Sequence, residues 1–351
     1  MKKLYRALAL VFTAAMLLSF AACSQSESPA SSEPPVESSS TPAPVETPEV
    51  SSDVDETEED AAPIRVAALN GPTGMGMSFL MSANENGETA QDYEFTLSGD
   101  PSAVNAAFIN GDYDIAAVPI NVAAVLYQKT GNVKLLAVNT LGVLYVLENG
   151  DSIQRIDDLA GKTVMATGQA STPEYVLSYL LEQNGLADSV EVQYLTEHSE
   201  LASLMAAGEC TLGMLPEPNV TVVTTKNPDV RVALDLTEEW EKTTGVQLVQ
   251  GCIIASAQFA EENPGAVDIF LDEYAQSVEN VNSDPAAAAQ LISQYGIVES
   301  AETAEKAIPN CNIVCLTGDE LRASADAMFN VLFEANPQSI GGAIPGEDIY
   351  Y

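Results

Sequence analysis

Few residues of this chain have types and spacings that could carry out covalent chemistry. The sequence contains one histidine, His198, and we find no Ser-His-Asp arrangement that includes it. Cys311 and Cys315 are separated by three residues, but a zinc site needs more ligands than this single pair supplies. We therefore expect no catalytic residue, no metal and no cofactor, and we predict that the protein is not an enzyme.

The sulfur-containing residues leave two alternatives open. Met75, Met77 and Met81 carry thioethers, which suit soft copper ions, but the helical spacing of the last two favours packing in a core. Besides Cys23 there are four cysteines, an even number that permits disulfides; a domain of this size does not need them, and buried free thiols are the favoured state of Cys210, Cys252, Cys311 and Cys315.

A glycine-containing turn is better suited to binding than to catalysis. An apolar run from Ile64 to Leu69 predicts a buried strand, and an Asn-Gly-Pro-Thr-Gly segment ends it. Gly71 and Gly74 let the backbone approach a ligand closely, and a helix beginning near Gly74 would direct unpaired N–H groups to the same place. The segment matches neither the phosphate-loop nor the dinucleotide-binding pattern, so we expect it to hold a small polar molecule.

The elements that would position this turn occur in two similar halves. Strand and helix patterns alternate, including a predicted helix from Pro101 to Asn110, and the order then restarts near Lys162. In each half a glycine is followed by an acidic residue, a short apolar strand and a proline, Pro119 or Pro216. The pattern predicts an α/β protein of two open doubly wound lobes, with ligand-facing loops around one cleft.

The lobe boundaries are predicted from the point at which the first alternation of strands and helices ends. A strand-like run reaches Leu147, and the polar stretch from Glu148 to Asp158 is interpreted as a crossing between the lobes. The predicted boundaries are 63–147 and 246–351 for the first lobe and 148–245 for the second. The C-terminal part, which includes a predicted helix from Phe259 to Asn282, is expected to pack on the first lobe.

The beginning of the chain predicts export. Met1 to Cys23 has a basic start, a short apolar run and small residues before the cysteine, and this end resembles a bacterial lipobox, although Phe20 stands where leucine is usual. We expect a lipoprotein signal peptide at 1–23 with lipidation of Cys23; an ordinary secretory signal is the alternative. Residues 24–62 are rich in Ser, Pro and Glu and are expected to form a disordered acidic tether. The predicted location is extracytoplasmic, with the lipid anchored in the cell membrane.

Charge excludes one class of partner. The chain has 51 acidic and 13 basic residues, a net charge of −38. Nucleic acid and anionic lipid headgroups attract clustered lysine and arginine, so we expect neither as a ligand. We expect a monomer.

Several motifs resemble one family. DLAGKTV at Asp158–Val164, STPE at the start of a helix, AAGE, and LPEP at Leu215–Pro218 resemble the solute-binding proteins of ABC importers, which have the type II periplasmic-binding-protein fold. The resemblance covers Ile64 to about Asn336 and is closest to the group that binds nitrate, sulfonates, taurine and thiamine pyrimidine.

The resemblance implies a function and a site. It implies lobe closure about crossings near Gly142–Glu148 and Val246–Gly251, capture of a small solute, and delivery to an ABC permease. The implied ligand contacts are Gly71, Thr73, Gly74, Met75, Pro119, Asn121, Asn139, Thr140, Gln169, Ser171, Thr172 and Glu217.

The chemistry of the solute stays open. None of these loops contains lysine or arginine, so a sulfonate would be held by backbone N–H groups, whereas Glu217 could accept from an aminopyrimidine or simply occupy the first turn of a helix. Two other functions also stay open: a ligand-sensing lipoprotein without transport, and an enzyme similar to thiamine-pyrimidine synthases.

Overall fold

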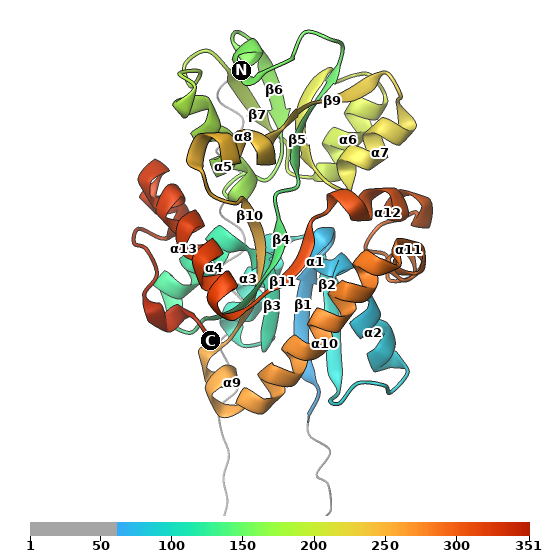
Figure 1. The fold of residues 1–351 in the computed structure, drawn as a ribbon, viewed down its shortest axis with the longest axis vertical. Coiled ribbons are helices and arrows are strands. Elements are labelled where there is room, and N and C mark those ends of the chain that lie inside the picture. Colours follow the sequence, from blue (N-terminus) through green and yellow to red (C-terminus); the bar gives the residue numbers. More distant parts are fainter. Residues whose placement is uncertain (1–61) are drawn as a thin grey trace, which may run out of the picture. The chain divides into compact units, whose positions relative to one another are not determined.

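The computed structural model describes residues 62–351. The predicted signal peptide, Cys23 and nearly all of the predicted tether lie outside this range. Two β-sheets, each covered by helices, organise the described residues (Figure 1). Within 62–351, no helix has the length and apolar character needed to cross a membrane.

The first sheet has six strands in the order β11-β4-β10-β3-β1-β2. They are β1 (Ile64–Leu69), β2 (Tyr93–Ser98), β3 (Ile115–Pro119), β4 (Lys134–Leu141), β10 (Val249–Ala255) and β11 (Ile313–Leu316). β1 pairs in parallel with β2 and β3, while β10 runs antiparallel between β3 and β4. Every residue of β10 is buried, as expected of a central strand covered on both faces.

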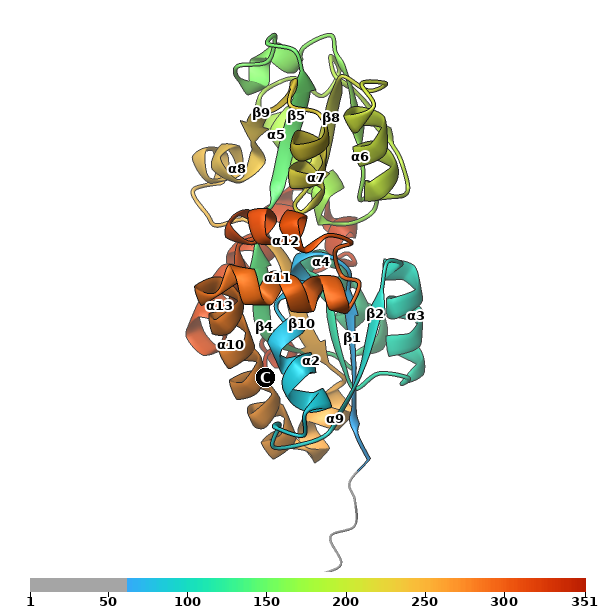
Figure 2. The same cartoon turned by 90° about the vertical axis from the view of Figure 1, so that its right-hand side faces the viewer.

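Helices cover both faces of this sheet because successive strand residues point to opposite sides. Ile115 and Ala117 pack with α1, α2 and α10–α12, whereas Ala116 and Val118 pack with α3, α4 and α13. Figure 2 shows α2, α10 and α11 on one side. The helices are α1 (Pro72–Met75), α2 (Ser78–Glu85), α3 (Pro101–Asn110), α4 (Ile120–Thr130), α9 (Ala257–Glu262), α10 (Pro264–Ser283), α11 (Pro285–Gln294), α12 (Ala301–Ala307) and α13 (Gly318–Ala335).

The second sheet has five strands in the order β7-β6-β8-β5-β9. They are β5 (Leu144–Asn149), β6 (Thr163–Ala166), β7 (Glu191–Tyr194), β8 (Leu212–Pro216) and β9 (Val230–Asp235), with helices α5 (Thr172–Gln183), α6 (His198–Ala206), α7 (Asn219–Lys226) and α8 (Leu236–Thr244). β6 is parallel to β7 and β8, and β5 is antiparallel to β8 and β9. Short 3-10 helices lie at Ile156–Leu159, Ile308–Asn310, Pro337–Ile340 and Glu347–Ile349.

The predicted lobe boundary at residue 147 is wrong. Leu144 to Leu147 belong to β5, which pairs with β8 and β9 of the second sheet. The chain therefore leaves the first lobe at residues 142–143 and returns at 245–248.

The stretch after Glu148 is part of the second lobe and is not a crossing. The Glu148 carboxylate is buried and pairs with Arg231 at 2.8 Å. Burial raises the pKa of this carboxyl, but hydrogen bonds from Ser152 and Ile153 and the charge of Arg231 lower it by more. These contacts hold the stretch against β9.

Helix predictions were accurate where caps are local and wrong where proline intervenes. The helix predicted at Pro101–Asn110 is confirmed as α3, which Asp100 caps by accepting from Ser102 and Ala103. The helix predicted from Phe259 is two helices, α9 and α10, because Pro264 starts a new one. The helix expected near Gly74 is also divided, into one short turn, α1, and α2.

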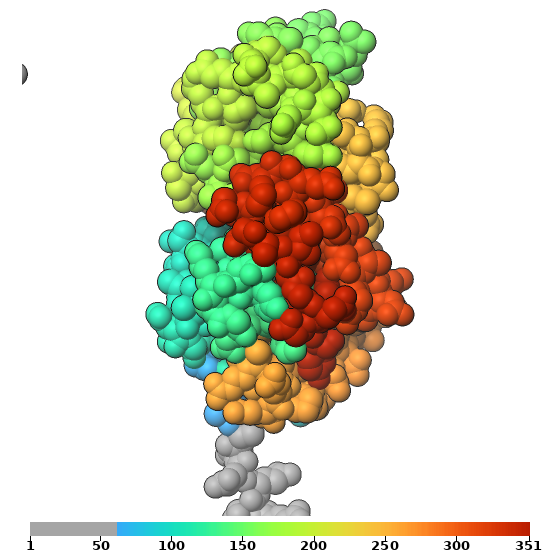
Figure 3. Space-filling view, turned by 90° about the vertical axis from the view of Figure 1, so that its left-hand side faces the viewer, coloured from blue at the N-terminus to red at the C-terminus, as the bar shows by residue number. Residues whose placement is uncertain are grey.

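The C-terminal part packs on the first lobe and also touches the second. α13 contacts α4 and β10 of the first lobe and α5 of the second, and α12 contacts α7. Figure 3 shows the C-terminal residues, in red, between residues of the two lobes. Cys210, Cys252 and Cys311 are buried and Cys315 is half-buried, and all four are free thiols.

The strand that returns to the first lobe requires glycine at position 251. A Cβ at Gly251 would lie 2.6 Å from Asn139 Oδ1 and 3.0 Å from Thr73 Cγ2. We expect Gly251→Ala to lower the free energy of unfolding by about 1–3 kcal/mol, since the side chains of Asn139, Thr73 and Thr140 must move. Urea unfolding of the variant and of the unsubstituted protein measures this difference in free energy of unfolding.

The matched control is Gly265→Ala in α10, where a Cβ would meet open space. This change should leave stability unchanged or raise it by up to about 1 kcal/mol, because alanine favours helix. Equal stability of both variants would contradict the packing described for Gly251.

Candidate functional site

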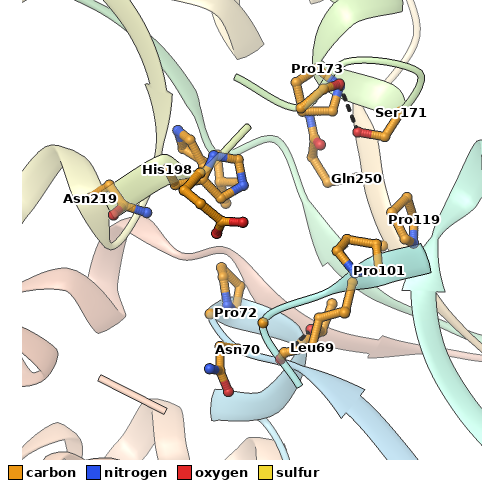
Figure 4. Close-up of a pocket in the computed structure, with 18 of the residues that line it drawn as sticks. Leu69, Asn70, Pro72, Pro101, Pro119, Ser171, Pro173, His198, Asn219 and Gln250 are labelled. Carbon is orange, nitrogen blue, oxygen red and sulfur yellow. Dashed lines mark hydrogen bonds between the residues drawn. The ribbon is translucent and has the colours of Figure 1, made fainter. Parts of the chain in front are cut away.

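A cavity of about 590 Å³ lies between the two lobes. Residues of both sheets line it, and its volume suits a small organic molecule. Figure 4 shows some of the lining residues, among them Asn70, Pro72, Pro101, Pro119, Ser171, Pro173, His198, Asn219 and Gln250. We call this cavity the cleft.

The ends of the central strands form the floor of the cleft on the first lobe. Pro119 of β3 pairs with Gly251 of β10, and Gly251 pairs with Thr140 of β4. All three residues line the cleft. Pro119 and Thr140 lie at the carboxyl ends of β3 and β4, the ends at which open α/β sheets bind ligands.

Helix N-termini also face the cleft. α4 begins after Pro119 and α5 after Ser171, and no side chain caps either helix. Uncapped N-termini offer backbone N–H groups and a partial positive charge. Among the lining residues there is no lysine or arginine, and the carboxylates are Asp100, Glu197 and Glu217. The cleft therefore combines helix dipoles with acidic side chains.

The predicted ligand contacts divide into two groups. Those that line the cleft are Gly71, Thr73, Pro119, Thr140, Gln169, Ser171 and Glu217. Those that the structure does not bring to the lining are Gly74, Met75, Asn121, Asn139 and Thr172.

Packing explains three of the residues outside the lining. A Cβ at Gly74 would lie 2.7 Å from the Leu69 carbonyl oxygen, so this glycine serves the turn itself. Met75 is fully buried, with its sulfur 3.9 Å from Cys311 Sγ. Asn139 is fully buried behind Gly251.

The other two residues join the lobes to each other. Thr172 Oγ1 at the start of α5 donates to Asn121 Oδ1 in α4 at 3.1 Å, and both residues are buried. Asn121 Nδ2 in turn donates to the Ser339 carbonyl oxygen. This hydrogen bond across the lobes lies beside the cleft.

Glu217 follows β8 and is almost fully buried. Its carboxylate accepts from the backbone N–H and the hydroxyl of Thr221, both at 3.0 Å. Burial raises the pKa of the carboxyl, although hydrogen bonds from Thr221 and Asn310 oppose the shift. Its position fits both roles expected from the sequence, since it supports α7 and also lines the cleft.

Sequence reasoning missed His198 and Gln250. No ligand contact was predicted for His198 from the sequence, but it is half-buried at the start of α6 and lines the cleft. Its Nδ1 lies 2.6 Å from Thr167 Oγ1, and burial lowers the pKa of the imidazole to about 4, so it is neutral at neutral pH. Its position directly after a strand-like segment is the signal that could have placed it at the edge of the sheet.

Within 62–351 no three histidine, cysteine, aspartate or glutamate side chains are grouped in a way that could hold an ion. Met77 and Met81 are buried core residues, in line with the packing interpretation of their spacing.

Residues 73–317 match the family model described as menaquinone biosynthesis. The chain belongs to the menaquinone biosynthesis family. A comparison with curated protein sequences found no significant match.

Solved structures share the fold at low sequence identity. An ABC transporter from Parabacteroides distasonis has a TM-score of 0.68 and 22% identity, covering 82% of this chain and 98% of its own. The alkanesulfonate-binding protein SsuA from Xanthomonas axonopodis pv. citri, bound to MOPS, has a TM-score of 0.64 and 13% identity, covering 82% and 96%.

A third similar structure is the zinc-bound ligand-binding component of an ABC-type import system from Staphylococcus aureus. Its TM-score is 0.63 at 12% identity, covering 82% of this chain and 95% of its own. The predicted periplasmic-binding-protein-like fold is confirmed for this member of the menaquinone biosynthesis family.

The buried carboxyl at the cleft predicts a pH dependence. A raised folded-state pKa makes Glu217 favour folding below the unfolded-state pKa of about 4.3, and this contribution is lost as the pH rises through the folded-state value. Glutamine does not ionise in this pH range, so the Glu217→Gln variant does not lose stability in this way as the pH rises. The free energy of unfolding of this variant relative to the unsubstituted protein should therefore increase as the pH rises from about 4 to 8.

Urea unfolding at several pH values measures the difference. Glu241→Gln, at an exposed position of α8, is the control and should give a constant offset. If the free energy of unfolding of Glu217→Gln relative to the unsubstituted protein fell with rising pH, the buried environment assigned to the Glu217 carboxyl would be contradicted.

The hydrogen bond between the lobes predicts a second effect. Thr172→Val keeps the shape of the side chain but leaves the buried Asn121 Oδ1 without its donor, so the free energy of unfolding should fall by about 1–3 kcal/mol. Hydrogen exchange should also become faster at the start of α4 and α5.

The control is Thr303→Val, a half-buried position of α12 that takes no part in the Thr172–Asn121 hydrogen bond. Its exchange at α4 and α5 should equal that of the unsubstituted protein. Unchanged exchange in Thr172→Val would mean that this bond does not hold the lobes together.

Proposed function

We propose that the protein is the extracytoplasmic solute-binding receptor of an ABC importer. It captures a small polar solute in the cleft and presents it to a membrane permease. The observation that carries the proposal is that residues of both lobes line one cavity while only two chain crossings join the sheets. The similar structures named as an ABC transporter and as the ligand-binding component of an ABC-type import system support this function, as does the one named as an alkanesulfonate-binding protein.

Closure of the lobes is the proposed mechanism. The crossings at 142–143 and 245–248 are short, so rotation about them moves one wall of the cleft toward the other. The Thr172–Asn121 hydrogen bond stabilises the closed arrangement. No bond of the solute is made or broken.

Lipid attachment at Cys23 completes the proposal. The lipid holds the receptor at the outer face of the cell membrane, the acidic tether spans the distance to the lobes, and the protein acts as a monomer. A ligand-sensing lipoprotein would share all these features and would differ only in lacking a permease partner.

An enzyme is the second candidate, and specific observations favour it. The family is described as one of menaquinone biosynthesis. The cleft also holds a neutral imidazole, His198, and a carboxyl with a raised pKa, Glu217, which are a potential base and a potential acid. An enzyme would release a changed product, whereas a receptor returns its ligand unchanged.

Thermal unfolding of the purified protein against a panel of compounds tests the receptor proposal. The panel contains alkanesulfonates, nitrate, carboxylates, aminopyrimidines, other nucleobases and polyamines. At a hundred times its dissociation constant a bound compound stabilises the folded state by about 2.7 kcal/mol, which raises the midpoint by several degrees. Mass spectrometry of the released compound then distinguishes receptor from enzyme.

The cleft variant Thr73→Ala combined with Glu217→Ala serves as the control. It should lose the shift produced by the effective compound. A shift that persists in this variant would place binding outside the cleft, and conversion of the compound would replace the receptor proposal with the enzyme.

A further inference from the structure

Two hydrogen-bonding groups at the floor of the cleft have no partner among the described residues. They are Gln250 Nε2 and Thr140 Oγ1. Gln250 is 9% exposed and Thr140 2% exposed, and both residues line the cleft. A buried polar group without a partner is costly, so its retention in a site of this kind points to a ligand atom that completes it.

A β-bulge places the glutamine there. Val249 pairs with Leu141 and Gly251 pairs with Thr140, so Gln250 has no residue opposite it on β4. The rest of this central strand is apolar or glycine. Bulges redirect a side chain and occur often beside active sites, and this one brings an amide to the cleft (Figure 4).

The α4 N-terminus adds a third favourable element. Pro119, which precedes α4, is the register partner of Gly251 on the other side of β10. The helix has 11 residues and no side-chain cap. The start of α4 therefore follows the strand beside Gln250 and Gly251. The amide Nε2 and the helix N-terminus both favour an acceptor atom, and the Thr140 hydroxyl can donate to the same atom.

We propose that Gln250 and Thr140 select a solute that presents an accepting oxygen to the floor of the cleft. The oxygen belongs to a carboxylate, a sulfonate or a neutral carbonyl group. Gln250 Nε2 and Thr140 Oγ1 donate to it, and the α4 N-terminus stabilises its negative charge. The inference rests on the proposed receptor function and specifies the class of solute.

The test compares four probes that share one ring and differ in one group: benzoate, benzenesulfonate, benzamide and benzylamine. Calorimetric titration of the purified protein should detect the first three, which carry an accepting oxygen, and not benzylamine. Comparing the first two with benzamide distinguishes an anionic oxygen from a neutral one.

Gln250→Met and Thr140→Val each remove a donor and keep most of the side-chain volume. Each should weaken binding of the accepting probes about tenfold. Gln294→Met, at an exposed position of α11, is the control and should leave the affinities unchanged. Unchanged affinities in Gln250→Met, or preferential binding of benzylamine, would overturn the proposal.

A measurement without ligand provides an independent check. Because Gln250 Nε2 has no protein partner, Gln250→Met should keep or raise the unfolding midpoint of the ligand-free protein. A midpoint clearly below that of Gln294→Met would mean that the amide has a structural role and would overturn the proposal.

The two proposals can fail separately. If the unsubstituted protein binds none of the four probes, the assignment of solute class is overturned. Binding of any compound of the larger panel would still support the receptor.

Discussion

The pairing of β4 with β10 is the constraint on which the rest of the structure depends. The chain leaves the first lobe at the end of β4 and returns at the start of β10, and these two strands are hydrogen-bonded neighbours. The two crossings therefore lie side by side. The same pairing brings Thr140, Gly251 and Pro119 together at the floor of the cleft.

Close packing at the start of β10 restricts which residues can occupy positions 250 and 251. Gly251 has no room for a side chain, and the bulge at Gln250 changes the register of a strand that is otherwise fully buried. An apolar residue at position 250 would satisfy the packing equally well. The presence of an amide is therefore better explained by the chemistry of the cleft than by the stability of the sheet.

Much of the fold could be predicted from local sequence patterns, and the errors of that prediction have physical causes. The repeated Gly-acid-strand-Pro segments predicted two similar lobes and placed Pro119 at a strand end, where the structure has it. β5 was assigned to the wrong lobe because an apolar run does not reveal its partner, and β5 is defined by its pairing with β8. Glu148 was misread because its partner Arg231 is distant in sequence.

The site was harder to predict than the fold. Loops at strand ends were correctly expected to line a common cleft, but which side chains reach it depends on tertiary packing. Asn121 and Thr172 have suitable types and positions, yet they bond to each other. Gln250 could not be found because its exposure to the cleft depends on a bulge, and a bulge requires knowledge of the neighbouring strand.

A crystal structure of the protein with the compound that most raises its unfolding midpoint would test the account most directly. We predict one chemically intact molecule between the lobes, contacted by both, with an oxygen within hydrogen-bonding distance of Gln250 Nε2 and Thr140 Oγ1. A molecule bound to one lobe outside the cleft, or a chemically altered molecule within it, would contradict the account.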